Sequence, residues 1–412
     1  MTSLSDWLDR IGVEHPRGVR RGLEHVRDVA ERLDVLPPAP CCIVVAGTNG
    51  KGSTAAFVES LLLAAGRTVG TTTSPHLHRF NERIRINGRE ADDANIVAAF
   101  EAVEACRQGA GLSYFEYAIL AALKVITEAG VDHAVLEIGL GGRLDAVNVV
   151  DADVAVITSI GLDHQDYLGA TRELIGAEKA GILRSGIPLV YGERVPPRSV
   201  TARAHDLDVP VYLAGRDFGH VGRSLWFRDR DQRGSLELPE SAVDPVNAAT
   251  AVQVTRLSGC PLDQSAVAAA AGRVRNPGRF EVVRRDDRVW VFDVAHNPDG
   301  AEFLAGQLRE RFAGRIAGAV VGCLEDKDVK SIVAPLVPLV GEFVYADTVG
   351  ARGAKGTALR AAVDDRRALA GTLAEATEHL VAATAPGDVI LVLGSFDVVE
   401  RARARFGLDG NR

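Results

Sequence analysis

The sequence predicts an α/β protein with two domains, each built around a mostly parallel sheet. Short runs of apolar, often β-branched residues alternate with helical runs of about ten to fifteen residues, a pattern typical of helices that connect parallel strands. This alternation stops at Asn276-Pro277-Gly278 and then starts again. A chain of 412 residues is long enough for two or three domains. We therefore expect a larger domain over residues 1–276 and a smaller α/β domain over residues 277–412.

The strands are expected where short apolar runs stand between helical ones. In the first domain they are CCIVVA (41–46), TVGTTT (68–73), VDHAVLEI (131–138), DVAVITSI (153–160) and IPLVYGE (187–193). The clearest helices between them are AAFVESLLLAA (55–65) and FEYAILAALKVITEAG (115–130). Residues 215–240 show short polar alternation, which indicates hairpins at the edge of the domain, and helices at about 243–258 and 262–274 follow. The strands of the second domain are RVWVFDVA (288–295), IAGAVVGCL (316–324), EFVYADT (342–348) and DVILVLGS (388–395).

Composition and charge exclude several classes of function. The chain has no apolar run of roughly 18 residues, and its start, MTSLSDWLDR, lacks the basic and apolar regions of a signal peptide, so we expect a cytoplasmic protein. The five cysteines lack CxxC spacing and indicate neither a disulfide framework nor a zinc site. A net charge of −8 argues against the basic face of a nucleic-acid binder. We expect a monomer with small-molecule substrates and no nucleic-acid or membrane partner.

A glycine-rich loop, Gly47-Thr48-Asn49-Gly50-Lys51-Gly52-Ser53-Thr54, directly follows the first apolar strand and leads into a helix. Glycines let backbone N–H groups approach a phosphate, the helix N-terminus favours an anion, and Lys51 supplies positive charge. The strict Walker spacing is not met, because Val45 and Gly52 stand where it requires a glycine and a hydroxyl residue. Ser53 or Thr54 would then take the hydroxyl role. The alternative is a glycine-rich turn with a solvated lysine.

This loop resembles the ATP loop of the Mur ligase superfamily, and SPHLHRFNERIRING (74–88) is similar to its folate-ligase branch, the dihydrofolate and folylpolyglutamate synthases. Nine further blocks follow in the family's order, which is far more specific than one motif. They are SYFEY (113–117), LEIGLGGRLDAVNVV (136–150), SIGLDHQDYLG (159–169), EKAGI (178–182), NAATA (247–251), NPGRFEVV (276–283), DVAHNP (293–298), CLEDKD (323–328) and GSF (394–396). The resemblance implies a P-loop-type ATPase domain followed by a Rossmann-like domain, with ATP at their interface.

The resemblance also implies a metal site at Ser74, Glu137 and His164. In the family the matching residues hold two Mg²⁺ ions, which the glutamate bridges, and a monovalent cation is a further expectation. Mg²⁺ prefers carboxylate, hydroxyl and water ligands, and Glu137 stands at the carboxyl end of an expected strand. Taken alone, Glu137 could be a capping or salt-bridged carboxylate. His164 could be a loop histidine bonded to Asp163 or Asp166.

Lys179, in EKAGI, would ordinarily be an exposed helix lysine. By resemblance it is carbamylated to N6-carboxylysine, which turns a cation into an anion that supports the second Mg²⁺ site. The reaction with CO₂ needs an amine that is often neutral, and partial burial favours that form. The residues expected to carry the chemistry are therefore Lys51, Glu137, His164 and Lys179.

Two larger sets of binding residues come from the resemblance. ATP is expected to contact Thr48, Asn49, Gly50, Lys51, Gly52, Ser53, Asn247, Arg279, Asp293 and His296. The pterin or folate is expected to contact Gly22, Pro75, Arg83, Ser113, Tyr114, Phe115, Glu116, Leu144, Asp145 and Ala146. An arginine can donate bidentately to ATP oxygens, and aromatic faces suit a flat heterocycle. Without the resemblance, Asn247 could be a helix N-cap, Asp293 a strand-end turn residue and Phe115 a core residue.

One stretch departs from the family. Relatives commonly read Asp-Leu-Gly-Leu-Glu-Arg where this chain reads Arg20-Arg21-Gly22-Leu23-Glu24-His25. The stretch contributes to the dihydropteroate site of the bifunctional bacterial enzymes. Loss of its acid could weaken pterin recognition, or the two arginines could attract the substrate's carboxylate.

The resemblance thus implies an ATP-dependent ligase that activates a carboxylate as an acyl phosphate and couples it to glutamate. The carboxylate would belong to dihydropteroate, to folyl(poly)glutamate or to both, and SYFEY and GLGGRLDA are most similar to bifunctional bacterial forms. A monofunctional folylpolyglutamate synthase and another Mur-type ligase are alternatives, although only about 40 residues precede the first strand, where a peptidoglycan-type ligase has a nucleotide-sugar domain. A non-catalytic P-loop nucleotide-binding protein would explain the loop but not DVAHNP.

Overall fold

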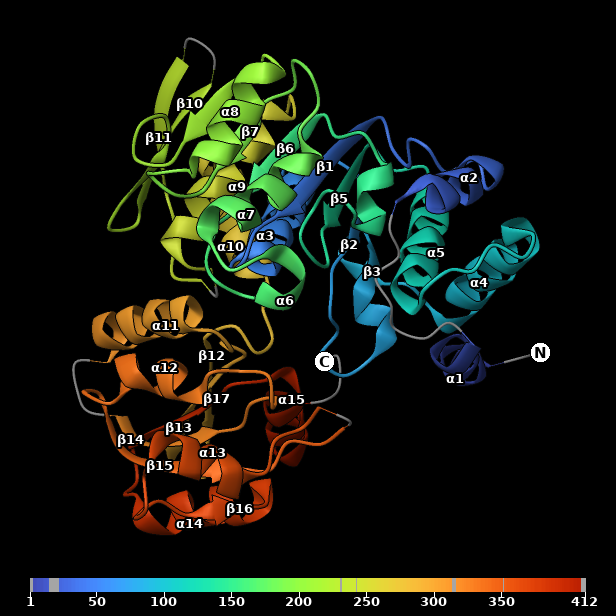
Figure 1. Cartoon of the computed structure of the whole chain (residues 1–412). Helices are drawn as coiled ribbons and strands as arrows, with labels where there is room; N and C mark the ends of the chain where they lie inside the picture. The colour runs from blue at the N-terminus through green and yellow to red at the C-terminus, as the bar shows by residue number, and fades with distance from the viewer. Residues whose placement is uncertain are drawn as a thin grey trace. The chain divides into compact units, whose positions relative to one another are not determined.

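The structure is a computed structural model that describes residues 3–14, 22–229, 232–241, 243–312, 316–350 and 352–408. The chain divides into two compact units, Met1–Arg275 and Asn276–Arg412, coloured from blue to yellow and from orange to red in Figure 1. Each unit is α/β with a mostly parallel sheet, which confirms the predicted fold class. Among the described helices, none has the length and apolar character needed to cross a membrane.

The first unit is organised around a sheet with the strand order β4-β3-β2-β5-β1-β6-β7-β8. Its parallel strands, in sheet order, are β2 (Val69–Thr72), β5 (His133–Glu137), β1 (Cys41–Ala46), β6 (Val154–Ile157), β7 (Leu189–Tyr191) and β8 (Val211–Leu213). The antiparallel strands β3 (Ile84–Ile86) and β4 (Arg89–Glu90) extend one edge. The expected strands of this domain all lie in the sheet.

Helices cover both faces of this sheet (Figure 1). The helices of this unit are α1 (Leu4–Glu14), α2 (Glu24–Arg32), α3 (Lys51–Ala64), α4 (Asp93–Arg107), α5 (Tyr114–Ala129), α6 (Gln165–Leu168), α7 (Arg172–Lys179), α8 (Arg198–Asp206), α9 (Pro245–Leu257) and α10 (Gln264–Arg273), with the 3₁₀ turns η1 (Phe80–Arg83), η2 (Ala146–Val149) and η3 (Ala180–Ile182). Val44 packs in a core with α2, α4 and α5, whereas its neighbours Ile43 and Val45 pack in a second core with α3, α9 and α10. A strand that is buried on both faces is apolar throughout, which explains the run CCIVVA.

Three strands between residues 219 and 229 and between 232 and 237 form a separate antiparallel sheet rather than an extension of the main one. Its order is β11-β10-β9, from β9 (Gly219–Val221), β10 (Ser224–Asp229) and β11 (Gln232–Glu237). Leu225 and Phe227 are buried in the core that contains α9, which fixes the sheet against that helix.

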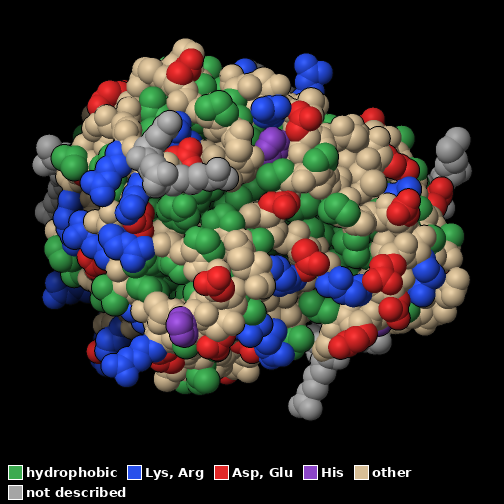
Figure 2. All heavy atoms as spheres, turned by 90° about the horizontal axis from the view of Figure 1, so that it is seen from above, with side chains coloured by type: hydrophobic (Ala, Val, Ile, Leu, Met, Phe, Trp, Pro, Cys, Tyr) green, Lys and Arg blue, Asp and Glu red, His purple; other side chains and the backbone are tan. Residues whose placement is uncertain are grey.

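On the face shown in Figure 2, Lys and Arg side chains gather toward the left, although the net charge is −8. Positively charged side chains are therefore concentrated in one part of this face.

The second unit has a sheet with the order β12-β13-β17-β14-β15-β16. The strands are β12 (Glu281–Arg285), β13 (Arg288–Asp293), β14 (Ile316–Val321), β15 (Val340–Ala346), β16 (Ala370–Gly371) and β17 (Val389–Leu393). The helices are α11 (Pro298–Arg311), α12 (Val329–Val333), α13 (Gly356–Val363), α14 (Leu373–Ala383) and α15 (Phe396–Arg405), with the 3₁₀ turn η4 (Ala334–Leu336). Only the β12–β13 pair is antiparallel among the described strand pairs of this sheet.

Candidate active site

The loop Gly47–Gly50 connects β1 to α3 at the carboxyl end of the parallel strands, which is where open α/β sheets bind ligands. Gly47 and Gly50 adopt φ angles of 152° and 82°, which favour glycine. A side chain at Gly47 would also overlap the hydroxyl of Thr158, at the end of β6. That hydroxyl donates to the Asn49 carbonyl oxygen at 2.6 Å. The neighbouring strand therefore holds the loop in one shape.

Two lysines donate to the same carbonyl oxygen of this loop. Lys51 Nζ lies 3.0 Å and Lys179 Nζ 2.8 Å from Gly47 O. Lys179 is only 3% exposed, so the alternative of an exposed helix lysine is wrong. Burial, reinforced by the positive charge of Lys51, lowers the pKa of Lys179 to about 7. Near neutral pH a large fraction of this amine is uncharged, which is the form that can react with CO₂.

Glu137 ends β5 beside the same loop and is 3% exposed. Its Oε2 accepts a hydrogen bond from the Ser74 backbone N–H at 2.8 Å. A methyl group at Gly52, in the first turn of α3, would lie 3.7 Å from Glu137 Oε1. The carboxylate therefore contacts the helix turn where phosphates are expected, and the Ser74 hydroxyl and Glu137 carboxylate are the oxygen ligands that Mg²⁺ prefers.

His164 lies on the loop before α6, with a φ of 50°. Its Nε2 is 4.0 Å from Asp163 Oδ2, and its side chain is 39% exposed. Across the described residues, no group of three His, Cys, Asp or Glu side chains is close enough to hold a metal ion. The structure thus brings Ser74 and Glu137 into contact, whereas His164 pairs with Asp163.

The expected aromatic segment lies next to the chain that follows β5. The ring of Phe115 packs on Gly139, two residues beyond Glu137, where a side chain would overlap it. The Arg83 guanidinium is 6.0 Å from the Tyr114 ring centroid. Its Nε donates to His76 Nδ1 at 2.7 Å. Burial and the charge of Arg83 lower the pKa of His76 to about 4, so the imidazole is neutral and accepts this bond.

The remaining expected substrate residues lie near these segments. Asp145, between Leu144 and Ala146, accepts backbone hydrogen bonds from Leu140 at 2.8 Å and Val147 at 3.0 Å. Burial raises its pKa to about 6. Pro75 follows Ser74 on the loop after β2. Gly22 adopts a φ of 95° just before α2, and Arg20 and Arg21 lie outside the described residues.

Asn247, expected to contact ATP, lies in the first unit on α9. Its Oδ1 accepts a hydrogen bond from Thr54 Oγ1 at 3.4 Å, and a side chain at Gly50 would meet it at 2.6 Å. The N-cap of α9 is Asp244, whose carboxylate accepts from Val246 N, so the N-cap alternative for Asn247 is wrong. Its amide instead lies over the glycine loop.

In the second unit, Arg279, Asp293 and His296 surround the end of β13. Asp293 accepts hydrogen bonds from the backbone of Phe280 at 2.8 Å and of Ala295 at 2.7 Å, so it does hold the strand-end turn. Burial raises its pKa, while Arg279 opposes that shift. His296 Nδ1 lies 2.8 Å from the Val294 carbonyl, which can only accept, so Nδ1 carries the proton.

Several residues of this arrangement were not predicted from the sequence. Thr158 and Ser159 fix Asn49, and His76 accepts from Arg83. Ser159 is part of the block SIGLDHQDYLG, so that block offered a signal. His76 lies in the block SPHLHRFNERIRING, within the loop 75–83 expected to meet the substrate, so that block also offered a signal. Thr158 acts through a contact between distant segments, for which the sequence offers no periodic signal.

Comparisons with known proteins identify the family of the chain. The family models described as "Mur ligase middle domain" and "Mur ligase, glutamate ligase domain" match residues 45–188 and 278–396. The dihydrofolate synthase/folylpolyglutamate synthase of Escherichia coli K12 is 41% identical over 397 residues, which cover 96% of this chain and 94% of that protein.

Two solved structures extend the likeness to the fold. E. coli FolC in complex with DHPP and ADP superposes with a TM-score of 0.93 at 39% identity and covers 98% of both chains. The bifunctional folylpolyglutamate synthase/dihydrofolate synthase of Yersinia pestis complexed with AMPPNP and Mn gives a TM-score of 0.93 at 40% identity over 99% of both chains.

Proposed function

This chain belongs to the dihydrofolate synthase/folylpolyglutamate synthase branch of the Mur ligase family, and on that premise we propose that it joins L-glutamate to dihydropteroate and to folyl(poly)glutamate. It is an ATP-dependent carboxylate–amine ligase. The reaction consumes ATP, releases ADP and phosphate, and forms one amide bond.

The strongest support for this proposal is the placement of two lysines and one glutamate at the glycine loop. Lys51 and Lys179 converge on the carbonyl of Gly47, and Glu137 contacts the first turn of α3 beside them. A nucleotide-binding loop needs only one lysine. A second buried lysine and a buried carboxylate at the same place support transfer of the γ-phosphoryl group, which needs charges arranged on both sides of it.

In the first step, the loop residues Thr48 to Ser53 bind the ATP phosphates through backbone N–H groups, and Lys51 neutralises charge on the group in transfer. The carboxylate oxygen of the pteroate or folate attacks the γ-phosphorus, the bond to the β-phosphate breaks, and an acyl phosphate forms. In the second step, the glutamate amine attacks the acyl carbon. Phosphate leaves and the amine proton is lost to solvent.

A divalent metal ion is part of this proposal. Ser74 and Glu137 would hold it from the first unit, and His164 completes the proposed set for two Mg²⁺ ions, with carbamylated Lys179 supporting the second. When bound, such ions neutralise the phosphates and polarise the oxygens that react. The buried carboxylate of Glu137 and the partly exposed hydroxyl of Ser74 are oxygen donors that fit a hard cation. A monovalent cation belongs to the same proposal.

The second unit contributes Arg279, Asp293 and His296 to ATP in this proposal, and Asn247 contributes from α9. The guanidinium of Arg279 and the amide of Asn247 suit phosphate and base edges, and Nδ1 of His296 is engaged by the Val294 carbonyl. We further propose that the enzyme acts as a monomer in the cytoplasm. Its net charge of −8 supports small-molecule partners over nucleic acid.

The test supplies the purified protein with ATP, Mg²⁺ and L-glutamate, and offers dihydropteroate and tetrahydrofolate in separate reactions. We expect ADP release with both, and products heavier by one glutamyl residue on mass spectrometry. Activity on tetrahydrofolate alone would reduce the proposal to a monofunctional folylpolyglutamate synthase. Nucleotide binding without a product from either substrate would refute the folate assignment.

A further inference from the structure

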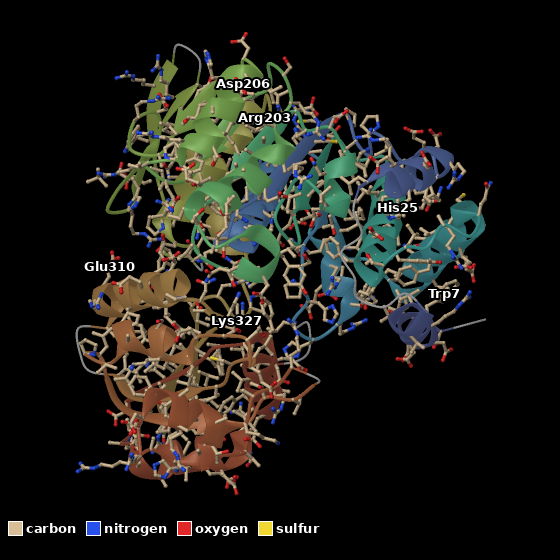
Figure 3. All side chains as sticks on the ribbon, in the orientation of Figure 1. Trp7, His25, Arg203, Asp206, Glu310 and Lys327 are labelled. Carbon is tan, nitrogen blue, oxygen red and sulfur yellow. The ribbon has the colours of Figure 1, made fainter. Side chains whose placement is uncertain are left out.

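His25 and Glu116 form a contact that the proposed chemistry does not use. His25 Nε2 lies 3.1 Å from Glu116 Oε1, although 91 positions separate the two residues. Their side chains are 24% and 10% exposed, so water has little access to the contact. Because an ionised carboxylate can only accept, the proton of this hydrogen bond belongs to His25. The contact, whose histidine is labelled in Figure 3, ties α2 to the start of α5.

The second carboxylate oxygen of Glu116 is also engaged. Glu116 Oε2 accepts from the backbone N–H of Ser113 at 2.6 Å, and Ser113 Oγ accepts from the backbone N–H of Glu116 at 3.3 Å, which is a capping box. A capping box alone holds one oxygen and leaves rotation about the last side-chain bond. The bond from His25 removes that rotation. Each oxygen still has a second lone pair for another donor.

The backbone that carries His25 is itself held firmly. Val26, Val29 and Ala30 of α2 are fully buried in the core shared with α5. Ahead of the helix, Gly22 has a φ of 95°, and a side chain there would overlap the Glu24 carboxylate. The backbone of α2 therefore holds the imidazole of His25 in a fixed position next to Glu116. The imidazole links two segments, at Gly22 and at Ser113–Glu116, that the resemblance to the family assigns to the pterin or folate.

We propose that His25 is a positioning residue for the pteridine ring of the substrate: it holds the Glu116 carboxylate in the orientation that accepts the ring's hydrogen bonds. This role rests on the proposed function. The 2-amino-4-oxo edge of a pteridine presents two adjacent N–H donors, and the paired oxygens of a carboxylate match such an edge as they match a guanidinium. His25 acts on binding of the pteridine and not on the phosphates.

The experiment compares three variants of the full chain in the ligase assay. His25→Leu removes the donor and keeps the bulk. His25→Gln restores an N–H donor of similar reach. His205→Leu makes the same chemical change at an exposed histidine of α8 and serves as the matched control. Initial rates with dihydropteroate, ATP and glutamate each varied in turn give KM and kcat, and thermal unfolding checks the fold.

We expect His25→Leu to raise the KM for dihydropteroate about tenfold, the effect of losing a hydrogen bond to a charged group. We expect kcat and the KM for ATP to stay within about twofold, since the loop at Gly47 is untouched. His25→Gln recovers most of the affinity, and His205→Leu resembles the wild type. The unfolding temperature of His25→Leu stays near that of the control, because the bonds between Ser113 and Glu116 remain.

Three results would overturn the role of His25 while leaving the ligase intact. They are an unchanged KM for dihydropteroate in His25→Leu, an equal rise in the KM of all three substrates, and a His25→Gln variant no better than His25→Leu. A wild-type protein inactive on both pteridine substrates overturns the proposed function instead, and the His25 role with it.

Discussion

The phosphate region and the pteridine region of the first unit are built from different kinds of contact. Around the loop Gly47–Gly50, charged side chains bind backbone groups: Lys51 and Lys179 donate to one carbonyl, and Glu137 accepts from one N–H. In the pteridine region, Asp145 also binds backbone groups, but side chains bind one another as well: Arg83 binds His76, and His25 binds Glu116. A backbone carbonyl survives any substitution and a backbone N–H any except proline, whereas a side-chain partner is lost when its residue is replaced. The phosphate region therefore depends on a few irreplaceable groups, and the pteridine region on pairs that can change together.

The largest effect is expected where one charge acts on the transferred phosphoryl group. Lys51→Ala lowers kcat about a thousandfold and leaves the KM for dihydropteroate nearly unchanged, because the lysine stabilises charge that develops in the transition state. ADP release measures it. Lys124→Ala, which removes a lysine paired with Glu128 on α5, is the control and stays near wild type. A Lys51→Ala variant with a raised pteridine KM and normal kcat would break the distinction between the regions.

Lys179→Ala is expected to lower kcat about a hundredfold, since it removes the proposed carbamate. Protein exchanged with ¹³C-labelled bicarbonate gives a carbamate signal by ¹³C NMR in the wild type and none in this variant. Full activity in Lys179→Ala, or an absent signal in an active wild type, would refute the modification.

Glu137→Gln is expected to weaken activation by Mg²⁺ by tenfold or more, because the amide keeps the contact with Ser74 N but loses the negative charge. The Mg²⁺ concentration for half-maximal rate measures this, and Mn²⁺ binding followed by electron paramagnetic resonance gives a readout independent of turnover. An unchanged metal requirement would remove Glu137 from the site.

The lowered pKa of Lys179 also predicts how the stability of the fold depends on pH. Its pKa falls from 10.5 in the unfolded chain to about 7 in the folded one. Between these values the unfolded state holds more protons, so the free energy of unfolding rises with pH, by at most about 1.4 kcal/mol per pH unit from this group. Urea unfolding in CO₂-free buffer at pH 7, 8 and 9 measures it. In Lys179→Met this rise is absent; equal slopes in both proteins would contradict a lowered pKa.

The smallest effect is expected in the pteridine region. Tyr114→Leu removes the ring next to Arg83 and raises the KM for dihydropteroate about fivefold, the scale of one aromatic or cation–π contact. We expect kcat and the KM for ATP to remain close to wild type in steady-state assays. A fall in kcat comparable with that of Lys51→Ala would show that the two regions are not separable.

The sequence predicted the parts of the fold that depend on local pattern. CCIVVA is recognisable as a buried strand because the side chains on both of its faces pack in hydrophobic cores. The loop Gly47–Ser53 is recognisable because its glycines, lysine and hydroxyl residue are consecutive in the sequence. The sheet β9–β11 was expected as edge hairpins, and it is separate because Leu225 and Phe227 pack toward α9. That packing is a tertiary effect that no short window contains.

The candidate site could be predicted only in part for the same reason. Lys51 stands in a motif, but the burial of Lys179 results from packing of distant segments, and only the resemblance to a family pointed to it. The bond between Thr158 and Asn49 spans 109 positions, and the contact between His25 and Glu116 spans 91. Neither pair has a spacing that a helix or strand would impose, so neither could be inferred from sequence alone.

The carbonyl oxygen of Gly47 accepts hydrogen bonds from two lysines, and this affects nucleotide binding. A carbonyl oxygen has two lone pairs, and the two lysines occupy both. The loop backbone is therefore ordered before any ligand binds, and the conformational entropy of about 1–2 kcal/mol per residue is lost on folding rather than on binding. Binding of ATP therefore costs less backbone entropy at this loop than it would at a disordered one.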